Sequence, residues 1–455
     1  MTGRESDRSR RLGAAGVALL CAVALSGCAD SLAGMSLPSL PKIQDLNPFA
    51  EKEAPLPGKR VSVMQQQENI ASNLASADKP ISLPPPRQND EWSQPGGGPT
   101  NVLGHLALGS SVKPVWTADA GSGSSFYGKL TASPIVYANK VFTLDAAGKV
   151  SAFNTSGGSA VWRVSTTPPN EKDHEGFGGG LAADGGRVYA ATGFGYVVAL
   201  DPASGKKLWE KYLGSPIRTS PTAHGERVFV VTKDGQAYCL SGSDGAELWN
   251  FRGIPERASI LSNASPAVDG DVAVFPFATG EVVALRISNG QPVWSESLAR
   301  TRTASSLASM SDAARPAIDS GVVFAVGHAG RIVATQQKTG ERLWSLTVPS
   351  IQAPWVAGES VFVVDTSGQL MAITRRDGKV QWTTKLTGSS TWSGPVLAGN
   401  RLWLASNKGH LVGVDAVTGK VETSQDLGQP VLIAPIVAGS RMYVLTDKAK
   451  LIALN

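Results

Sequence analysis

Tryptophan recurs at a nearly regular interval, and this period restricts the fold more than any other feature of the sequence. Seven of the 11 tryptophans each end a short β-like stretch, and their successive spacings are 46, 47, 40, 45, 50 and 38 residues. They are Trp116, Trp162, Trp209, Trp249, Trp294, Trp344 and Trp382. The same position recurs 41 residues later as Thr423. The sequence therefore predicts an array of structural repeats.

Each repeat has the pattern of a small antiparallel sheet. A proline is followed by a glycine, a β run, a polar turn with glycine, a second β run that often closes on Ala-Leu-Asp, and then glycine and tryptophan. Eight copies of this pattern are present, and the 50 Gly and 28 Pro of the chain supply its turns. A period of about 40–45 residues with roughly four short strands is typical of a β-propeller blade. We therefore expect an all-β, eight-bladed propeller over residues 100–455.

The order of the strands predicts how the ring closes. The chain stops at residues 451–455, in the third strand of the last copy, whereas Val115 and Trp116 belong to a fourth strand that nothing precedes. One such sheet cannot bury both of its faces, so it is stable only in a closed ring. We expect residues 103–117 to complete the last blade. The repeated tryptophans are expected to pack between adjacent blades, because each aromatic side chain buries about 150–250 Å².

Charge and cysteine content exclude other classes of protein. Three cysteines in 455 residues cannot staple a disulfide-rich fold. The net charge of +5 is small for this length, and no Lys/Arg-rich block interleaved with aromatic residues occurs. The sequence therefore does not predict a nucleic-acid partner.

The first 27 residues have the pattern of a lipoprotein signal peptide. Four arginines precede an apolar run from Leu12 to Leu25, which is shorter than the roughly 20 residues needed to span a bilayer. The run ends in Leu-Ser-Gly-Cys, which resembles a bacterial lipobox, and we expect lipidation of Cys28. Ala29 and Asp30 follow, and by analogy with enterobacterial sorting they favour the outer membrane. An ordinary secretory signal that happens to end near a cysteine is the alternative.

Residues 28–99 are expected to form the lipidated cysteine and a flexible linker. The segment is rich in Pro, Ser, Gln and charged residues, includes Pro84-Pro85-Pro86 and Gly96-Gly97-Gly98, and shows no sustained periodicity. Such a linker would let the folded body stand off the membrane that holds it.

The repeat resembles a known superfamily. The segment 199–209, ALDPASGKKLW, and its echo at residues 414–420, VDAVTGK, resemble the blade repeat of the pyrroloquinoline-quinone (PQQ) propellers. This resemblance covers residues 100–455 and implies the fold. It does not imply one function, because quinoprotein dehydrogenases and the BamB family of outer-membrane assembly lipoproteins share the repeat.

The residues that a quinoprotein dehydrogenase needs are not evident. Such enzymes resemble one another in a vicinal cysteine pair and in a Ca²⁺ held on long insertions, whereas this propeller has only Cys239, expected as a buried core thiol, and nearly minimal blades. None of the five histidines pairs with another at metal-ligand spacing. The aspartates Asp145, Asp201 and Asp415 are expected to cap turns after the third strands rather than to act as bases. We predict no enzyme activity, no metal and no cofactor, with the dehydrogenase retained as an alternative.

The order of lipobox, linker and eight short blades resembles the BamB family, and residues 89–94 and 104–109 resemble its alphaproteobacterial branch. The resemblance implies a non-catalytic scaffold, lipid-anchored on the periplasmic face of the outer membrane. It also implies a subunit of the β-barrel assembly (BAM) complex that binds a POTRA domain of BamA, contacts other BAM subunits and assists unfolded outer-membrane proteins. An outer-membrane lipoprotein propeller with another partner is a further alternative.

Two connections between blades are candidates for the partner-binding site. The connection from Trp294 to Pro316 spans 22 residues and its neighbour from Trp249 to Pro266 spans 17, and long loops on a rigid ring commonly carry binding. The resemblance places contacts with BamA in these two loops. The candidate residues are Ile260, Leu261, Asn263, Leu307, Met310, Asp312 and Arg315. The isoleucine, leucine and methionine would be apolar anchors, with Asp312 and Arg315 orienting a complementary charge; solvated or self-packed loop residues are the alternative.

Overall fold

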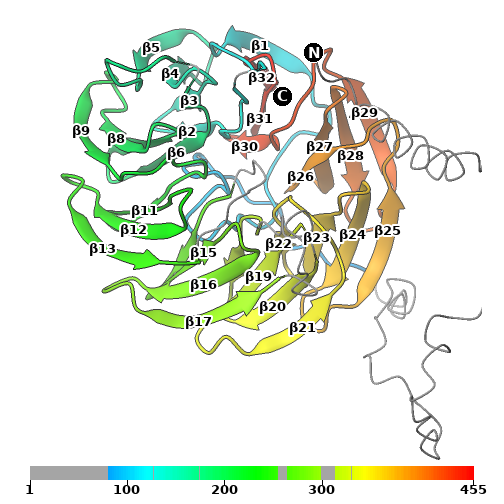
Figure 1. Ribbon diagram of the computed structural model, residues 1–455. Helices are drawn as coiled ribbons and strands as arrows, with labels where there is room; N and C mark the ends of the chain where they lie inside the picture. Colours follow the sequence, from blue (N-terminus) through cyan, green and yellow to red (C-terminus); the bar gives the residue numbers. More distant parts are fainter. Residues whose placement is uncertain (1–79, 127, 174, 255–263, 299–312, 329) are drawn as a thin grey trace, which may run out of the picture. The chain divides into compact units, whose positions relative to one another are not determined.

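The polypeptide forms a ring of eight antiparallel four-stranded sheets around a common centre, as the sequence predicts (Figure 1). The computed structural model describes residues 80–126, 128–173, 175–254, 264–298, 313–328 and 330–455. Within these ranges all 32 elements are strands and none is a helix. No helix in the described residues is long and apolar enough to cross a membrane.

The first strand in the chain belongs to the last blade, and the other strands follow blade by blade. They are β1 (Pro114–Asp119); β2 (Ile135–Tyr137), β3 (Lys140–Leu144), β4 (Lys149–Asn154) and β5 (Ala160–Ser165) in blade 1; β6 (Gly179–Asp184), β7 (Arg187–Thr192), β8 (Tyr196–Leu200) and β9 (Lys207–Tyr212) in blade 2; β10 (Thr222–His224), β11 (Arg227–Val231), β12 (Gln236–Ser241) and β13 (Glu247–Arg252) in blade 3; β14 (Ala267–Asp269), β15 (Val272–Pro276), β16 (Glu281–Arg286) and β17 (Pro292–Ser297) in blade 4; β18 (Ala317–Asp319), β19 (Val322–Val326), β20 (Ile332–Gln336) and β21 (Arg342–Leu346) in blade 5; β22 (Trp355–Ala357), β23 (Ser360–Val364), β24 (Gln369–Thr374) and β25 (Val380–Lys385) in blade 6; β26 (Trp392–Ala398), β27 (Arg401–Ser406), β28 (His410–Asp415) and β29 (Val421–Asp426) in blade 7; and β30 (Ile436–Ala438), β31 (Arg441–Leu445) and β32 (Lys450–Leu454) in blade 8.

The burial of each strand follows from its place in the blade. The second and third strands, such as β11 and β12, are buried along nearly their whole length because neighbouring blades cover both faces. The outer strands, such as β9, are largely exposed. The middle strands therefore consist of consecutive apolar residues because they pack on both sides. The outer strands are more polar because they contact solvent.

The ring closes as expected, through strand β1. This strand pairs antiparallel with β32, with Trp116 opposite Ala453 and Thr117 opposite Ile452. Lys113 and Asn455 exchange two backbone hydrogen bonds of 2.8 Å. Blade 8 is thus built from both ends of the propeller sequence, with the strand order β1-β32-β31-β30.

The repeated tryptophans join each blade to the next, as predicted. Each indole N–H donates to a backbone carbonyl in the turn between the third and fourth strands of the following blade, over 2.7–3.2 Å. The pairs are Trp116 with Thr155, Trp162 with Pro202, Trp209 with Gly242, Trp249 with Ile287, Trp294 with Gln337, Trp344 with Arg375 and Trp382 with Ala416. A glycine of the same turn lies against the ring: Gly245 has φ of 75°, and a Cβ there would lie 2.6 Å from Trp209.

Blade 7 departs from this arrangement, and the route of the chain explains why. The cross-strand set Phe362–Ala372–Trp382 of blade 6 becomes Trp403–Gly413–Thr423 in blade 7, so the large side chain moves from the outer strand to the second strand. Thr423 lies in the outer strand next to blade 8, whose own outer strand β1 precedes blade 1 in the chain, so β32 and β1 are not joined by the turn that joins the third and fourth strands of the other blades. A tryptophan there would have neither the turn carbonyl nor the turn glycine that the other seven contact.

Every outer strand carries a β-bulge at the same place. The register shifts immediately before the tryptophan position in all eight blades, for example between Ala199 and Leu200 of β8 where it pairs with β9. Bulges at sheet edges bend the strand and interrupt its row of unpaired backbone groups. The eight outer edges are therefore irregular templates for the addition of a further strand.

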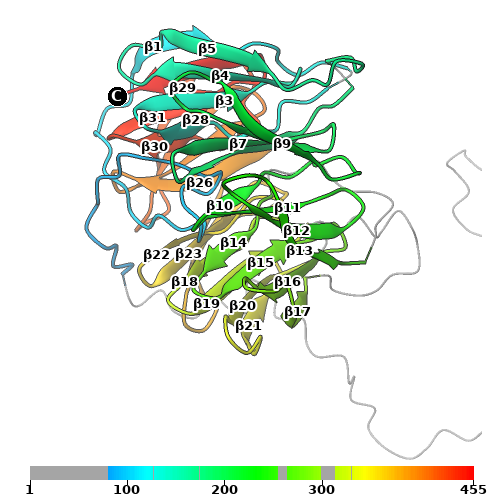
Figure 2. The same cartoon turned by 90° about the vertical axis from the view of Figure 1, so that its left-hand side faces the viewer.

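Residues 80–113, which we name the N-terminal strap, lie across one face of the ring (Figure 2). The strap bonds to an inner strand, or the residue next to it, in each of the eight blades. From blade 1 to blade 8 the pairs are Trp92 with Val136, Ser93 with Ala183, Gln94 with Ala223, Pro99 with Val268, Thr100 with Ile318, Gly104 with Trp355, Leu106 with Leu397, and Asn89 with Val437. The sequence predicts a flexible linker through residue 99, but residues 80–99 bind the ring through backbone groups and through the side chains of Asn89 and Gln94.

Buried side chains fix the strap as well. Trp92 is 1% exposed and stacks on Trp355 with 6.1 Å between ring centroids, and Leu106 is fully buried. His105 donates from Nδ1 to the carbonyl of Pro84 and accepts at Nε2 from the amide of Asn400. The strap is thus part of the folded core.

Candidate functional site

The face of the ring opposite the strap carries the connections between blades, and we name it the loop face. Of the predicted partner-binding residues, Ile260, Leu261, Asn263, Leu307, Met310 and Asp312 lie outside the described residues, as does Cys28. Arg315 is the remaining candidate, and it immediately precedes Pro316 and strand β18. The site is therefore described through Arg315 and the residues that flank the two long connections.

Arg315 is set into the inner end of blade 5. The carbonyl of the adjacent Pro316 accepts from the Asn101 side chain over 2.9 Å, and the amide of Ala314 donates to Val326 over 2.9 Å. The side chain of Arg315 is half-buried, and loss of water around the guanidinium lowers its pKa to about 10. Arg315 is therefore partly covered at the start of blade 5, a position compatible with both roles that the sequence leaves open, partner contact and a self-packed loop residue.

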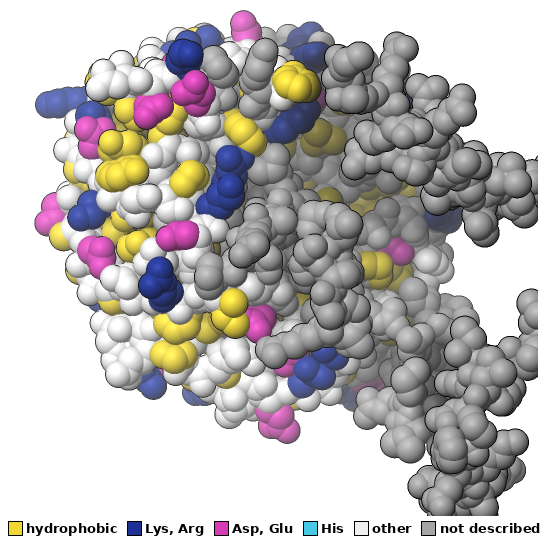
Figure 3. Space-filling model, in the orientation of Figure 1, with side chains coloured by type: hydrophobic (Ala, Val, Ile, Leu, Met, Phe, Trp, Pro, Cys, Tyr) yellow, Lys and Arg dark blue, Asp and Glu magenta, His cyan; other side chains and the backbone are white. Residues whose placement is uncertain are grey.

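Large hydrophobic side chains are exposed where the outer strands of blades 2 and 3 end. Tyr212 at the end of β9 is 56% exposed, and Ile254, the last described residue before the first long connection, is 58% exposed. Arg252 and Lys233 are also exposed on this side. Figure 3 views this face and shows hydrophobic side chains among charged ones over blades 1 to 3. Aromatic, aliphatic and arginine side chains together are the usual composition of a protein-binding hot spot.

A second arginine lies at the inner end of blade 3. The guanidinium carbon of Arg218 is 4.1 Å from the centroid of the Phe177 ring, which belongs to the preceding connection. Burial lowers the pKa of Arg218, as it does that of Arg315. The cation–π contact joins two neighbouring blades at the loop face. Sequence reasoning missed Tyr212, Ile254 and Arg218, although Tyr212 stands out in the repeat because the corresponding position in other blades is polar or charged.

The three aspartates that the sequence offers as possible catalytic bases all cap turns. Asp201 accepts from the amide of Ser204 over 2.7 Å, and Asp415 accepts from the amide of Thr418 over 2.7 Å, so both cap turns after third strands as predicted. Asp145 instead caps the turn after a second strand, β3, through the amides of Ala147 and Lys149. No group of three or more His, Cys, Asp or Glu side chains suited to a metal ion occurs within the described ranges.

Cys239 is a fully buried thiol, and we expect it to be inert. Burial raises the pKa of Cys239 from 9.0 to about 12, so the thiol stays protonated near neutral pH. An aromatic disulfide reagent at pH 8 should give the same number of reacting thiols in the native chain and in a Cys239→Ala chain. The two should differ by one thiol only after denaturation. Rapid labelling of native Cys239 would contradict this burial.

The same shift predicts how stability depends on pH. The pKa of Cys239 is higher in the folded state, so its contribution to stability is fully present below the unfolded value near 9 and is lost as the pH rises toward 12. Cys239→Ala should therefore flatten the alkaline decrease in stability, measured by chemical denaturation between pH 8 and 11.

The comparison with known proteins identifies the family. A sequence model described as "Outer membrane protein assembly factor BamB" matches residues 146–384 and 382–455, which is more than half of the chain. The chain belongs to the BamB family. Members from individual organisms are distant: BamB of Shewanella oneidensis is 25% identical over 332 residues, covering 70% of this chain and 84% of that protein.

Other relatives of the BamB family match over less of their length. BamB of Burkholderia pseudomallei is 27% identical over 44% of this chain and 50% of its own length. An uncharacterized protein of Rickettsia prowazekii is 26% identical over 66% of this chain and 63% of its own length. The Rickettsia match agrees with the alphaproteobacterial type suggested by the sequence. The chain thus spans between half and two thirds of these two proteins.

Solved structures share the fold at low identity. The crystal structure of BamB from Moraxella catarrhalis aligns with a TM-score of 0.64 at 18% identity, over 76% of this chain and 100% of that one. The quinohemoprotein alcohol dehydrogenase from Comamonas testosteroni aligns with a TM-score of 0.65 at 12% identity, over 85% of this chain and 84% of that one. Fold similarity therefore does not separate the BamB family from the dehydrogenases, and membership rests on the sequence model.

Proposed function

We propose that this chain is a non-catalytic scaffold subunit of the BAM complex that binds a POTRA domain of BamA and assists the folding and insertion of outer-membrane proteins. Membership in the BamB family is the observation that carries the proposal. The loop face supports it, because exposed apolar and cationic side chains border the connections in which the family resemblance places BamA contacts. The proposal includes lipidation of Cys28, which would hold the ring at the periplasmic face of the outer membrane.

The described residues suggest how the partner is held. Ile254 directly precedes the connection that contains Ile260 and Leu261, and Tyr212 is exposed at the end of the outer strand of the neighbouring blade, so these side chains would supply apolar contacts to the partner. Arg252 and Lys233 would attract acidic residues at its margin, where charge mainly guides association. Asp312 and Met310 in the second connection would contact the partner from the neighbouring blade. Arg315 would shape the inner end of that connection.

Co-purification tests the proposal. A Leu261→Ala and Asp312→Ala double variant should lose BamA from membrane extracts, because an apolar anchor and a charged contact are both removed. The matched control is Leu343→Ala, which removes a side chain that is 43% exposed on outer strand β21, far from the long connections in the chain. Both variants should melt as the wild type does. Undiminished co-purification of the double variant would refute these contacts, and absence of BamA with the wild type would refute the partner.

A further inference from the structure

One interface between blades lacks the tryptophan contact that the others have. Seven interfaces have an indole donating to a turn carbonyl of the next blade, whereas blade 7 presents Thr423 to blade 8. Blade 8 is itself completed by β1 without a turn from β32, through hydrogen bonds and the packing of Trp116 on Tyr443. The blade 7–blade 8 interface therefore needs another source of stability if the ring is to stay closed.

The N-terminal strap bonds to both sides of this interface. On blade 8, Asn89 accepts from the amide of Gly439 over 2.7 Å and donates its side-chain amide to Val437 over 2.7 Å. On blade 7, the amide of Leu106 donates to Leu397 over 3.1 Å, and Leu106 accepts from Gly399 over 2.9 Å. One strap residue thus makes two hydrogen bonds to each blade, with two different residues of that blade.

Two passes of the strap are bonded to each other between these points. The amide of Arg87 donates to His105 over 2.9 Å, and the amide of Ala107 donates to Arg87 over 2.8 Å. Hydrogen bonds therefore run without interruption from β26 of blade 7 through residues 105–107 to Arg87, and the chain then leads directly to Asn89 on blade 8. The strap forms a continuous bridge across the interface.

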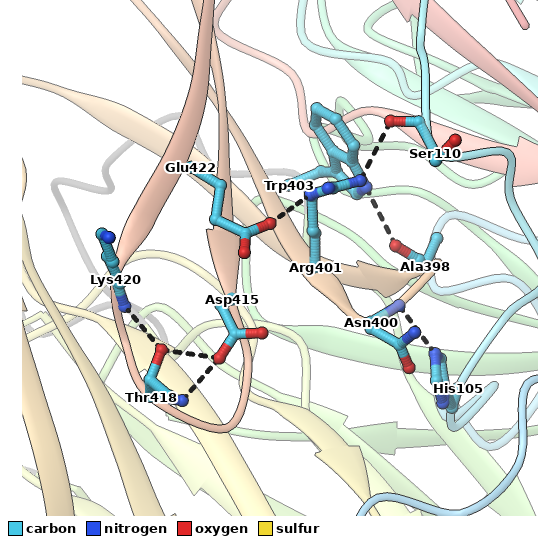
Figure 4. Close-up of polar contacts among 10 residues, drawn as sticks. All are labelled: His105, Ser110, Ala398, Asn400, Arg401, Trp403, Asp415, Thr418, Lys420 and Glu422. Carbon is cyan, nitrogen blue, oxygen red and sulfur yellow. Dashed lines mark hydrogen bonds and ion pairs between the residues drawn. The ribbon is translucent and has the colours of Figure 1, made fainter.

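A polar network ties the strap to the outer part of blade 7 (Figure 4). Arg401 donates from Nε to Glu422 of outer strand β29 over 2.6 Å, and from its terminal nitrogen to the carbonyl of Ser110 over 3.0 Å. Glu422 directly precedes Thr423. His105 accepts from the neighbouring Asn400 over 3.0 Å. The strap therefore contacts the inner part of blade 7 directly and is linked to the outer strand β29 through Arg401.

Apolar packing follows the same path. The largest hydrophobic cluster of the described residues joins Ile81, Trp92 and Leu106 of the strap with side chains of blades 6, 7 and 8 and a few of blade 1. Other blades pack in smaller clusters of neighbouring pairs. The strap thus shares a hydrophobic core with the blades around blade 8, the blade that is built from both ends of the propeller sequence.

We propose that the N-terminal strap replaces the missing tryptophan contact at the blade 7–blade 8 interface, and that releasing the strap opens the ring there. The strap is then a clasp: while it is docked the ring is closed, and when it is detached blades 7 and 8 separate before the other seven interfaces. This device is independent of the identity of the partner.

Hydrogen exchange on the full chain tests the clasp. Asn89→Ala with His105→Ala removes side-chain contacts beside the interface, and Gln94→Ala with Asn101→Ala removes buried side-chain hydrogen bonds to blades 3, 4 and 5. The first pair should speed amide exchange in β1, β28, β29 and β32 by about tenfold, the effect of losing roughly one strong hydrogen bond. The second pair should leave those strands within about twofold of the wild type.

The outcomes separate the clasp from general loosening. Faster exchange of β29 and β32 only in the first variant supports the proposal. Equal acceleration of these strands in both variants, or unchanged exchange in the first, overturns it. If the first double variant does not fold, the single variants Asn89→Ala and Gln94→Ala are compared in the same way, and the same two outcomes decide.

Discussion

A chain that lacks residues 100–120 should show no cooperative thermal unfolding. The deletion removes β1, so β32 loses its partner strand along the register from Lys450 to Leu454. It also removes Trp116, whose indole bonds to Thr155 of blade 1, and the half of the strap that contacts blades 5 to 7. Because a propeller blade is stable only between neighbours, opening the ring at blade 8 should destabilise the whole domain.

Circular dichroism at the strand wavelength measures this effect. A second deletion, of residues 80–99, serves as the control because it keeps β1 and the closing pair while removing part of the strap. That chain loses the clasp residues Arg87 and Asn89 but keeps the β1–β32 pair and the seven tryptophan contacts, so it should still melt cooperatively, at a lower temperature than the wild type. A cooperative and unshifted melt of the first deletion would contradict the assignment of β1 to the closure of the ring.

Trp249→Ala should lower the free energy of unfolding by about 3–5 kcal/mol, the usual cost of removing a large aromatic side chain from a core. Trp249 is 8% exposed and lies with its ring centroid 6.2 Å from that of Phe229 and 6.1 Å from that of Phe275. Its indole donates to Ile287 of blade 4 over 2.7 Å. The substitution leaves a cavity between two blades and an unpaired turn carbonyl.

Chemical denaturation measures the free energy of unfolding and distinguishes the loss of a buried tryptophan from the loss of an exposed side chain. Trp249→Phe keeps an aromatic ring and loses the N–H, so it should cost much less than the alanine variant. Leu208→Ala, on the outer strand of blade 2 and 46% exposed, should change stability by no more than about 0.5 kcal/mol. A loss below about 1 kcal/mol for Trp249→Ala would mean that the tryptophan contact does not hold the blades together.

The sequence predicts the ring because its signals are local and repeated. Each repeated tryptophan contacts the same turn of the next blade, and a turn glycine such as Gly245 makes room for it, so the period of the sequence is enough to infer the packing. The unpaired strand around Trp116 likewise indicates how the ring closes. Thr423 stands at the tryptophan position of blade 7 and breaks the period. The reason for this exception cannot be inferred from the sequence of blade 7 alone. Its explanation needs the strand order of blade 8, in which the outer strand β1 precedes blade 1 in the chain and is not joined to β32 by a turn.

The strap was missed because its bonds leave no pattern in the sequence. Residues such as Ser93, Pro99 and Thr100 bind through backbone carbonyls, which every amino acid has. The proline and glycine content of this segment is typical of a linker. Here these residues belong to a chain that crosses the inner strands of all eight blades. A buried Trp92 in a polar stretch was the available signal, because a tryptophan rarely remains in solvent.

The candidate site was predicted less completely than the fold. Loop length selects two connections as candidates, but it does not indicate which of their side chains are exposed. Arg315, a candidate for partner contact, is half-buried just before β18, whereas Ile254 and Tyr212 are exposed and were not candidates. Exposure in these connections depends on how neighbouring blades cover each residue, which the repeat pattern does not encode.

The bulges of the outer strands bear on how a client chain could be handled. An edge that is bulged in every blade is a poor template for strand addition, and the exposed charges of strands such as β9 oppose it further. We therefore expect unfolded barrel strands to contact the loop face rather than to extend a blade.

The strap also sets how the ring would bear a mechanical load. A pull on the chain from residue 80 reaches the eight inner strands through the strap before it reaches β1. The hydrogen bonds along the strap lie in series, so tension would break them one after another, beginning at Pro84 and continuing at Arg87 and Asn89. Arg87 and Asn89 flank the blade interface without a tryptophan, and such tension would thus act early on the interface between blades 7 and 8.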